Sequence, residues 1–182
     1  MSHPLRSLEP RLLGSLTIRL GGLLVFATGL MMFLDVPLQG ESSPWGIVSF
    51  ELAGTPHRAL RILLEWKSRG AIGHAKLIQI ADFVYLALYA MFFAALALLV
   101  GSRLDEAIWS ARAAWAATVA AAFDVLENAV LLYELGRFTS PAPFPQLAAS
   151  FALVKFALLV FSASYSVIGG VASLRRRQRR PL

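Results

Sequence analysis

The sequence predicts an all-α integral membrane protein, folded as a four-helix bundle with an amphipathic surface helix in its first extracytoplasmic loop. Of its 182 residues, 57% are hydrophobic and 15% are charged, and the mean hydropathy is +0.63. A soluble domain needs fewer apolar residues to fill its core, so lipid must cover much of this surface. Four segments are also long enough to cross a bilayer core of roughly 30 Å, which takes about 20 helical residues.

The four predicted spans must be helices, because the bilayer core offers no water to satisfy backbone amide groups. Arg6 and Arg11 precede the first span, as they would precede a signal peptide. Its apolar run is longer than the apolar core of a signal peptide, which usually has about 7 to 15 residues, so we expect a permanent helix. The spans belong to one transmembrane domain over residues 1–182 and cover Leu12 to Leu34, Leu77 to Val100, Ala107 to Tyr133 and Leu147 to Val171.

Basic residues predict the orientation of the bundle. Four spans place both chain ends on one side, and the positive-inside rule makes that side the cytoplasm. That side holds a basic tail over residues 172–182, together with Arg6, Arg11, Arg103 and Arg112. The opposite loop has a similar number of basic residues, namely Arg58, Arg61, Lys67, Arg69 and Lys76.

Residues 35–76 form the predicted loop with the surface helix. Thr55 followed by Pro56 is typical of a helix start, with a capping hydroxyl and a proline at the first helical position. The helix should end at Ser68, before Gly70. Its two sides differ, so we expect it to lie along the membrane surface. The apolar side has Leu60, Leu63 and Leu64, and the polar side has Arg58, Arg61 and Glu65.

Two further segments flank the surface helix and the last span. Ile47 to Ala53 is a short apolar run before the surface helix. The loop from Gly136 to Gln146 contains Pro141, Pro143 and Pro145, which predict an extended connection without helix.

Ionisable side chains within a membrane are costly and need partners, water or a function. Arg19 lies near the cytoplasmic end of the first span and can extend to the headgroups. The others are Asp82, Asp124, Glu127 and Lys155. At about 1.5 Å per residue, all four should lie roughly 8 to 15 Å below the outer surface, so they can meet.

The spacing of neighbouring polar residues extends this predicted cluster. Asp124, Glu127 and Asn128 share one face of the third span, because they are three and four residues apart. Tyr85 and Tyr89 follow Asp82 at successive turns of the second span. We expect Asp124 and Glu127 to be catalytic if the site is an enzyme's. The expected ligand-binding residues are Asp82, Tyr85, Tyr89, Asn128 and Lys155.

The three acids and one lysine have three interpretations. Surplus carboxylates should keep at least one acid protonated, which favours a site that binds a lipophilic small molecule or lipid, with acid/base catalysis as an option. Buried acids also occur in proton-coupled transport or relay components. The third interpretation is a structural or assembly subunit, in which the cluster is an ion-pair network that fixes helix register.

Several classes of function receive no support. The chain has no cysteine, so it has no disulfide or thiolate site. No histidine lies in a span, and the metal-binding pattern H-E-x-x-H does not occur. The hydrolase pattern G-x-S-x-G and a glycine-rich phosphate loop are also missing from the sequence. We therefore expect no metal and no cofactor. The net charge of +6 suggests anionic lipid rather than nucleic acid, and a homo-oligomer is an option. The expected headgroup contacts are Arg175, Arg176, Arg177, Arg179 and Arg180.

Four motifs occur in a recognisable order along the chain. They are F-E-L-A-G-T from Phe50, D-F-V-Y from Asp82, D-V-L-E-N from Asp124, and the lone Lys155. This order resembles a family of small bacterial four-helix integral membrane proteins of uncharacterised function, with D-x-x-E-N in the third span. The resemblance implies a bacterial inner membrane, the same topology and the same polar residues. It implies no activity.

Overall fold

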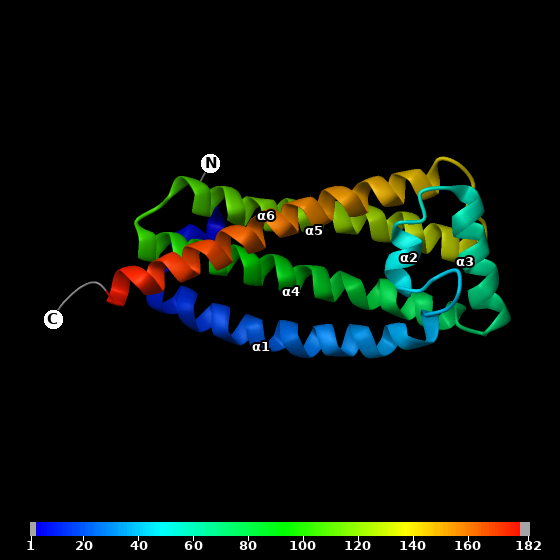
Figure 1. The fold of residues 1–182 in the computed structure, drawn as a ribbon, viewed down its shortest axis with the longest axis horizontal. Coiled ribbons are helices and arrows are strands. Elements are labelled where there is room, and N and C mark those ends of the chain that lie inside the picture. The colour runs from blue at the N-terminus through cyan, green and yellow to red at the C-terminus, as the bar shows by residue number, and fades with distance from the viewer. Residues whose placement is uncertain (1–2, 179–182) are drawn as a thin grey trace. The chain divides into compact units, whose positions relative to one another are not determined.

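The computed structural model describes residues 3–178, the last two by their backbone alone. The prediction of an all-α bundle is confirmed: the structure is 84% helical, with no strand among the described residues. Four helices are long and apolar enough to cross a membrane, and they contain the four predicted spans except Ala107, which precedes the third helix. In chain order (Figure 1) they are α1 (Pro10–Asp35), α4 (Ile72–Leu104), α5 (Ile108–Arg137) and α6 (Phe144–Gln178).

The chain forms two compact units, and each long helix contributes to both. We call one the terminal unit, because it includes both ends of the chain, and the other the loop unit, because it includes the segment between α1 and α4. The terminal unit comprises Met1–Leu24, Ala87–Ala121 and Phe156–Leu182. The loop unit comprises Val25–Leu86 and Ala122–Lys155.

The core of the loop unit forms around Trp66, which is fully buried. Its indole Nε1 donates to the carbonyl oxygen of Leu38 at 2.8 Å and to Oγ of Ser43 at 3.1 Å. The ring meets Phe50 edge to face, with centroids 5.3 Å apart. These contacts hold the short helices α2 (Ile47–Glu51) and α3 (Pro56–Ser68) against the ends of α4 and α5 in this unit (Figure 1).

Helix α3 has the predicted bounds, and the hydroxyl of Thr55 caps it by accepting from the Arg58 amide. The buried side differs from the predicted apolar side. Leu63 is buried, but Leu60 and Leu64 are 42% and 52% exposed. Packing in the loop unit explains the difference, because the helix turns its largest apolar residue, Trp66, inward. The buried side consists of Ala59, Ile62, Leu63 and Trp66.

Helix α2 forms within the apolar run before α3. Its start is fixed by the close approach of the Asp35 carboxylate to the backbone at Gly46. Gly46 has a φ of +54°, and a Cβ there would lie 1.9 Å from the Asp35 carboxylate. That carboxylate accepts a hydrogen bond of 2.7 Å from the Ile47 amide, the first residue of α2. Only glycine fits this backbone conformation and this space. The last residue of α2 is Glu51.

The connection between α5 and α6 is shorter than predicted. Helix α5 continues to Arg137 and α6 begins at Phe144, so both enter the predicted extended segment. Pro145 lies in the first turn of α6, where its missing amide hydrogen removes no helical hydrogen bond.

The core of the terminal unit uses small residues at helix contacts. It includes Leu13, Leu98 and several alanines of α4 and α5. A Cβ at Gly169 would lie 2.5 Å from Val100, so this glycine allows α6 to approach α4 closely. The predicted basic tail begins within α6. Arg179, Arg180 and the side chain of Arg177 lie outside the described residues.

Candidate functional site

Lys155 on α6 is the centre of a buried polar cluster in the loop unit. Its Nζ lies 2.8 Å from Oε2 of Glu127, 3.0 Å from Oδ1 of Asp124 and 3.5 Å from Oε2 of Glu51. The four side chains are at most 10% exposed. We call these four residues the Lys155 cluster.

Three helices position the cluster. Asp124 and Glu127 are three residues apart on α5, so one turn places both toward α6. The structure therefore brings together three residues that the sequence placed at similar depth. Glu51 is the additional member, and the sequence analysis missed it. Two signals point to it: Glu51 is an acid within the apolar run of residues 47–53, and it lies in the F-E-L-A-G-T motif.

Asp82 and Asn128 form a second polar pair. The Asn128 amide donates to Oδ2 of Asp82 at 2.6 Å, which joins α5 to α4. Asp82 also interacts electrostatically with Asp124, Lys155 and Glu51. The predicted ligand-binding residues Asp82, Asn128 and Lys155 thus belong to one polar region.

The two predicted tyrosines lie in different units. Tyr85 belongs to the loop unit, and its hydroxyl is 3.1 Å from Oγ1 of Thr28 on α1. Tyr89 is buried and belongs to the terminal unit. Only Tyr85 therefore shares a compact unit with Lys155.

Buried acceptor oxygens lack donors beside the cluster. Glu127 and Asn128 are both fully buried. Oε2 of Glu127 is held by the ion pair with Lys155, but among the described residues Oε1 of Glu127 and Oδ1 of Asn128 have no hydrogen-bond partner. Burying such a group without a donor costs about 1 to 3 kcal/mol. Moreover, three carboxylates surround one ammonium, which leaves an excess of buried negative charge.

This arrangement favours proton exchange or the binding of a donor. A proton or a cation would relieve the charge excess, and a proton or a hydrogen-bond donor would satisfy the open oxygens. Within the residues that the structure describes, no three His, Cys, Asp or Glu side chains are grouped to hold a metal ion. The lysine ammonium occupies the position between the carboxylates.

Glu134 is a further buried acid that the sequence analysis missed, because it follows the predicted end of the third span at Tyr133. It is fully buried on α5. The Ser140 hydroxyl donates a short hydrogen bond to Oε1 of Glu134, and Oε2 of Glu134 has no hydrogen-bond partner within the part of the chain that the structure describes. Glu127 and Glu134 are seven residues apart, two turns along one face of α5.

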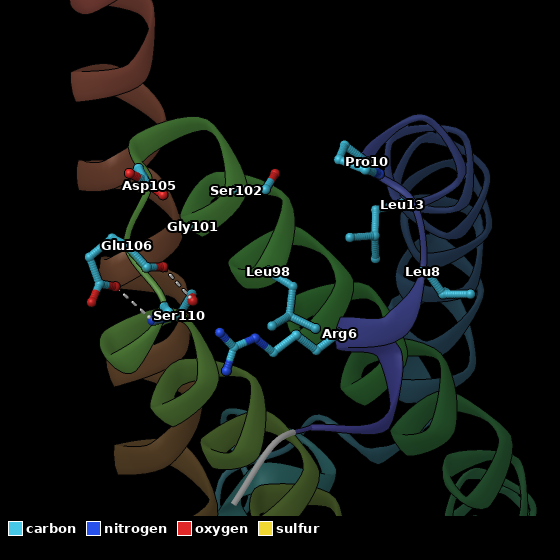
Figure 2. Close-up of a pocket in the computed structure, with 11 residues that line it drawn as sticks. Arg6, Leu8, Pro10, Leu13, Leu98, Gly101, Ser102, Asp105, Glu106 and Ser110 are labelled. Carbon is cyan, nitrogen blue, oxygen red and sulfur yellow. Dashed lines mark hydrogen bonds between the residues drawn. The ribbon is translucent and has the colours of Figure 1, made fainter.

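A separate cavity of about 270 Å³ lies in the terminal unit (Figure 2). Its lining includes Arg6, Leu98 and Glu106. The Glu106 carboxylate caps α5 by accepting from the amides of Ile108, Trp109 and Ser110 at 2.9 to 3.0 Å. Partial burial alone would raise the pKa of Glu106, but these hydrogen bonds outweigh it and hold the pKa below its ordinary value.

The fold and the site define a multi-pass helical membrane protein with a buried, carboxylate-rich lysine cluster. No protein-family model matches the chain, and neither a curated protein nor a solved structure matches it. The function must therefore be inferred from the site itself.

Proposed function

We propose that this membrane protein binds a lipophilic small molecule whose polar head donates hydrogen bonds to the Lys155 cluster. The observation that supports this proposal is a pair of fully buried oxygens, Oε1 of Glu127 and Oδ1 of Asn128, which have no hydrogen-bond partner among residues 3–178. Acceptors in such a position gain most from a donor that enters with the ligand, because water is scarce at this depth.

The charge of the cluster favours one class of polar head. Glu51, Asp124 and Glu127 outnumber the single ammonium of Lys155. A protonated amine supplies hydrogen-bond donors and also neutralises negative charge, whereas a hydroxyl supplies only the donor. A lipophilic amine is therefore the ligand class that fits the site best.

The residues have distinct roles in this proposal. Lys155 keeps one carboxylate ionised, and Asp82 orients the Asn128 amide toward the ligand through their hydrogen bond of 2.6 Å. Asp124 and Glu127 share Lys155, so one can hold a proton while the other is ionised. Any reaction at this site would use that pair as general acid and base.

A specific observation favours proton relay as the second candidate function. Glu127 and Glu134 are fully buried on one face of α5, and each has an unpartnered oxygen. Seven residues of helix separate them by about 10 Å, with the fully buried Leu131 between them. Buried acids in series occur along proton pathways, although water would have to pass Leu131.

We also propose that the protein lies in a bacterial inner membrane with both chain ends in the cytoplasm. The distribution of arginines supports this orientation, since the terminal unit has Arg6, Arg11, Arg103, Arg112 and Arg176.

Native mass spectrometry of the protein, released gently from its own membranes, tests the binding proposal. Glu127→Gln removes the charge of a cluster member, and Glu41→Gln makes the same change at an exposed acid of the loop unit. We expect a bound lipophilic amine in the wild type and in Glu41→Gln, and its loss from folded Glu127→Gln. The same bound molecules in all three proteins, or none in any, would overturn the proposal.

The relay proposal has a separate test in proteoliposomes that contain a pH-sensitive dye. Proton flux that disappears in Glu134→Gln and persists in Glu41→Gln would support a relay. Flux equal to that of empty liposomes would overturn it.

A further inference from the structure

An apolar groove with two arginines runs along the terminal unit. Its volume is about 810 Å³, and its walls come from α5, from α6 and from the 3-10 helix η1 (Pro4–Ser7). The lining includes Arg6, Arg112, Trp115, Val119, Leu158 and Phe161. From this groove we infer a binding site for one anionic phospholipid, with its phosphate at Arg6 and Arg112 and an acyl chain along Val119 and Leu158.

The two arginines supply positive charge that the protein leaves uncompensated. Both are exposed, and within the described residues neither forms an ion pair with a carboxylate. The Arg112 guanidinium lies over the Trp109 ring, 4.7 Å from its centroid. An arginine stacked in this way keeps its donors in plane and available to a phosphate.

The N-terminal segment is held on α5, which brings Arg6 to the groove. Nε2 of His3 is 3.1 Å from Oγ1 of Thr118, and Nδ1 of His3 accepts from the Leu5 amide at 3.3 Å. Figure 2 shows the Arg6 side chain extending from η1 toward α5, and the residue lines both the cavity and the groove.

An unused donor lies in the wall of the same groove. Nε1 of Trp115 is buried and has no hydrogen-bond partner among the described residues, and the ring packs edge to face against His3, with centroids 5.1 Å apart. An indole N–H can only donate, so it needs an acceptor. A phospholipid has suitable acceptors in its phosphate and in the ester carbonyls below it.

The apolar wall distinguishes a phospholipid from a free phosphate. Trp109 is half-exposed and its ring lies 6.5 Å from that of Phe161, as expected for aromatic residues at the membrane interface. Helix α5 extends about 10 Å from Arg112 to Val119, away from the level of the Trp109 ring. Val119 is 40% exposed, so apolar surface continues below the arginines, where an acyl chain would lie.

Lipid titration followed by native mass spectrometry tests the site. The probes are phosphatidylglycerol, phosphatidylcholine with the same acyl chains, and inorganic phosphate. The variant Arg6→Gln/Arg112→Gln is compared with Arg58→Gln/Arg61→Gln, which makes the same charge change at exposed arginines of α3.

We expect the wild type and the α3 variant to prefer phosphatidylglycerol. The groove variant should bind it at least about ten-fold more weakly, since each arginine near a lipid surface contributes about 1 kcal/mol. Phosphatidylglycerol binding that is equal in all three proteins, or that inorganic phosphate abolishes, would overturn the proposal.

Trp115→Phe keeps an aromatic ring, removes the indole N–H and reduces the ring that packs against His3, so it provides a second test if the double variant does not fold. We expect weaker phosphatidylglycerol binding and unchanged phosphatidylcholine binding. An unchanged preference for phosphatidylglycerol would contradict the site.

Discussion

The ammonium nitrogen of Lys155 on α6 lies 2.8 Å from a carboxylate oxygen of Glu127 on α5, and both side chains are buried. An isolated ion pair at such a position barely offsets the cost of removing two charges from water. Here two further carboxylates contact the same ammonium. The cluster therefore has more carboxylates than ammonium groups, and its stability depends on Lys155 more than on any single acid.

Lys155→Met should destabilise the protein strongly. It removes the only ammonium among three buried carboxylates, and breaking a buried ion pair in this way costs about 3 to 5 kcal/mol. Lys76→Met, at an exposed lysine of α4, is the control. Thermal unfolding in detergent measures the difference. We expect the second change Glu127→Gln to restore part of the lost stability, and a Lys155→Met protein as stable as the control would contradict this account.

Trp66→Phe should loosen the segment that includes α2 and α3. The change keeps an aromatic ring against Phe50 but removes the Nε1 donor to Leu38 and Ser43. We expect a loss of about 1 to 3 kcal/mol, because two buried hydrogen bonds are lost and the smaller ring fills the site less well, although the Ser43 hydroxyl still donates to the Leu38 carbonyl at 2.6 Å. Limited proteolysis within residues 39–46 measures the loosening. Trp45→Phe, at a side chain that is 67% exposed, should leave the cleavage rate unchanged.

The sequence predicted the parts of this fold that depend on local chemistry. The four spans follow from apolar length, and the start of α3 follows from the cap at Thr55 and the proline after it. Depth along the helices indicated that Lys155 could meet Asp124 and Glu127, because helices of known rise place residues at known levels, and the structure shows these contacts.

Other features depend on packing between distant segments, which the sequence does not show. Glu51 reaches Lys155 because α2 packs inward through Phe50 and Trp66. The exposure of Leu60 and Leu64 likewise follows from the rotation of α3 around Trp66. Glu134 was missed for a simpler reason: helix α5 continues past Tyr133, where the hydropathy of the sequence declines.

The cap of α5 should weaken in acid. The pKa of Glu106 is held below its ordinary value of 4.5, so its stabilising effect is complete above that value and is lost as the pH falls through the lower, folded-state pKa. Glu106→Gln should therefore increase amide exchange at Ile108, Trp109 and Ser110 at neutral pH, and the difference from the wild type should shrink in acid. Asp105→Asn, at the exposed neighbouring acid, is the matched control. An equal effect of both changes would contradict the cap.

The attachment of η1 to α5 should also weaken as the pH falls, but in a higher pH range than the cap formed by Glu106. Burial lowers the pKa of His3 from its ordinary value of 6.5, so the attached segment favours the neutral ring. Below pH 6.5 the detached segment binds a proton more readily than the attached one. The stabilising effect of the neutral ring is thus present above 6.5 and is lost as the pH falls through the lower, folded-state pKa. Amide exchange at Leu5, corrected for the intrinsic pH dependence of exchange, should accelerate over this range in the wild type.

His3→Asn provides the comparison for that measurement, because an asparagine can cap Leu5 without titrating. Its exchange rate at Leu5, corrected for intrinsic chemistry, should change little between pH 7 and pH 5. If detachment also removes Arg6 from the groove, phosphatidylglycerol binding in the wild type should weaken over the same pH range, whereas in His3→Asn it should stay constant. A wild type with constant exchange at Leu5 would show that His3 keeps η1 attached in either protonation state.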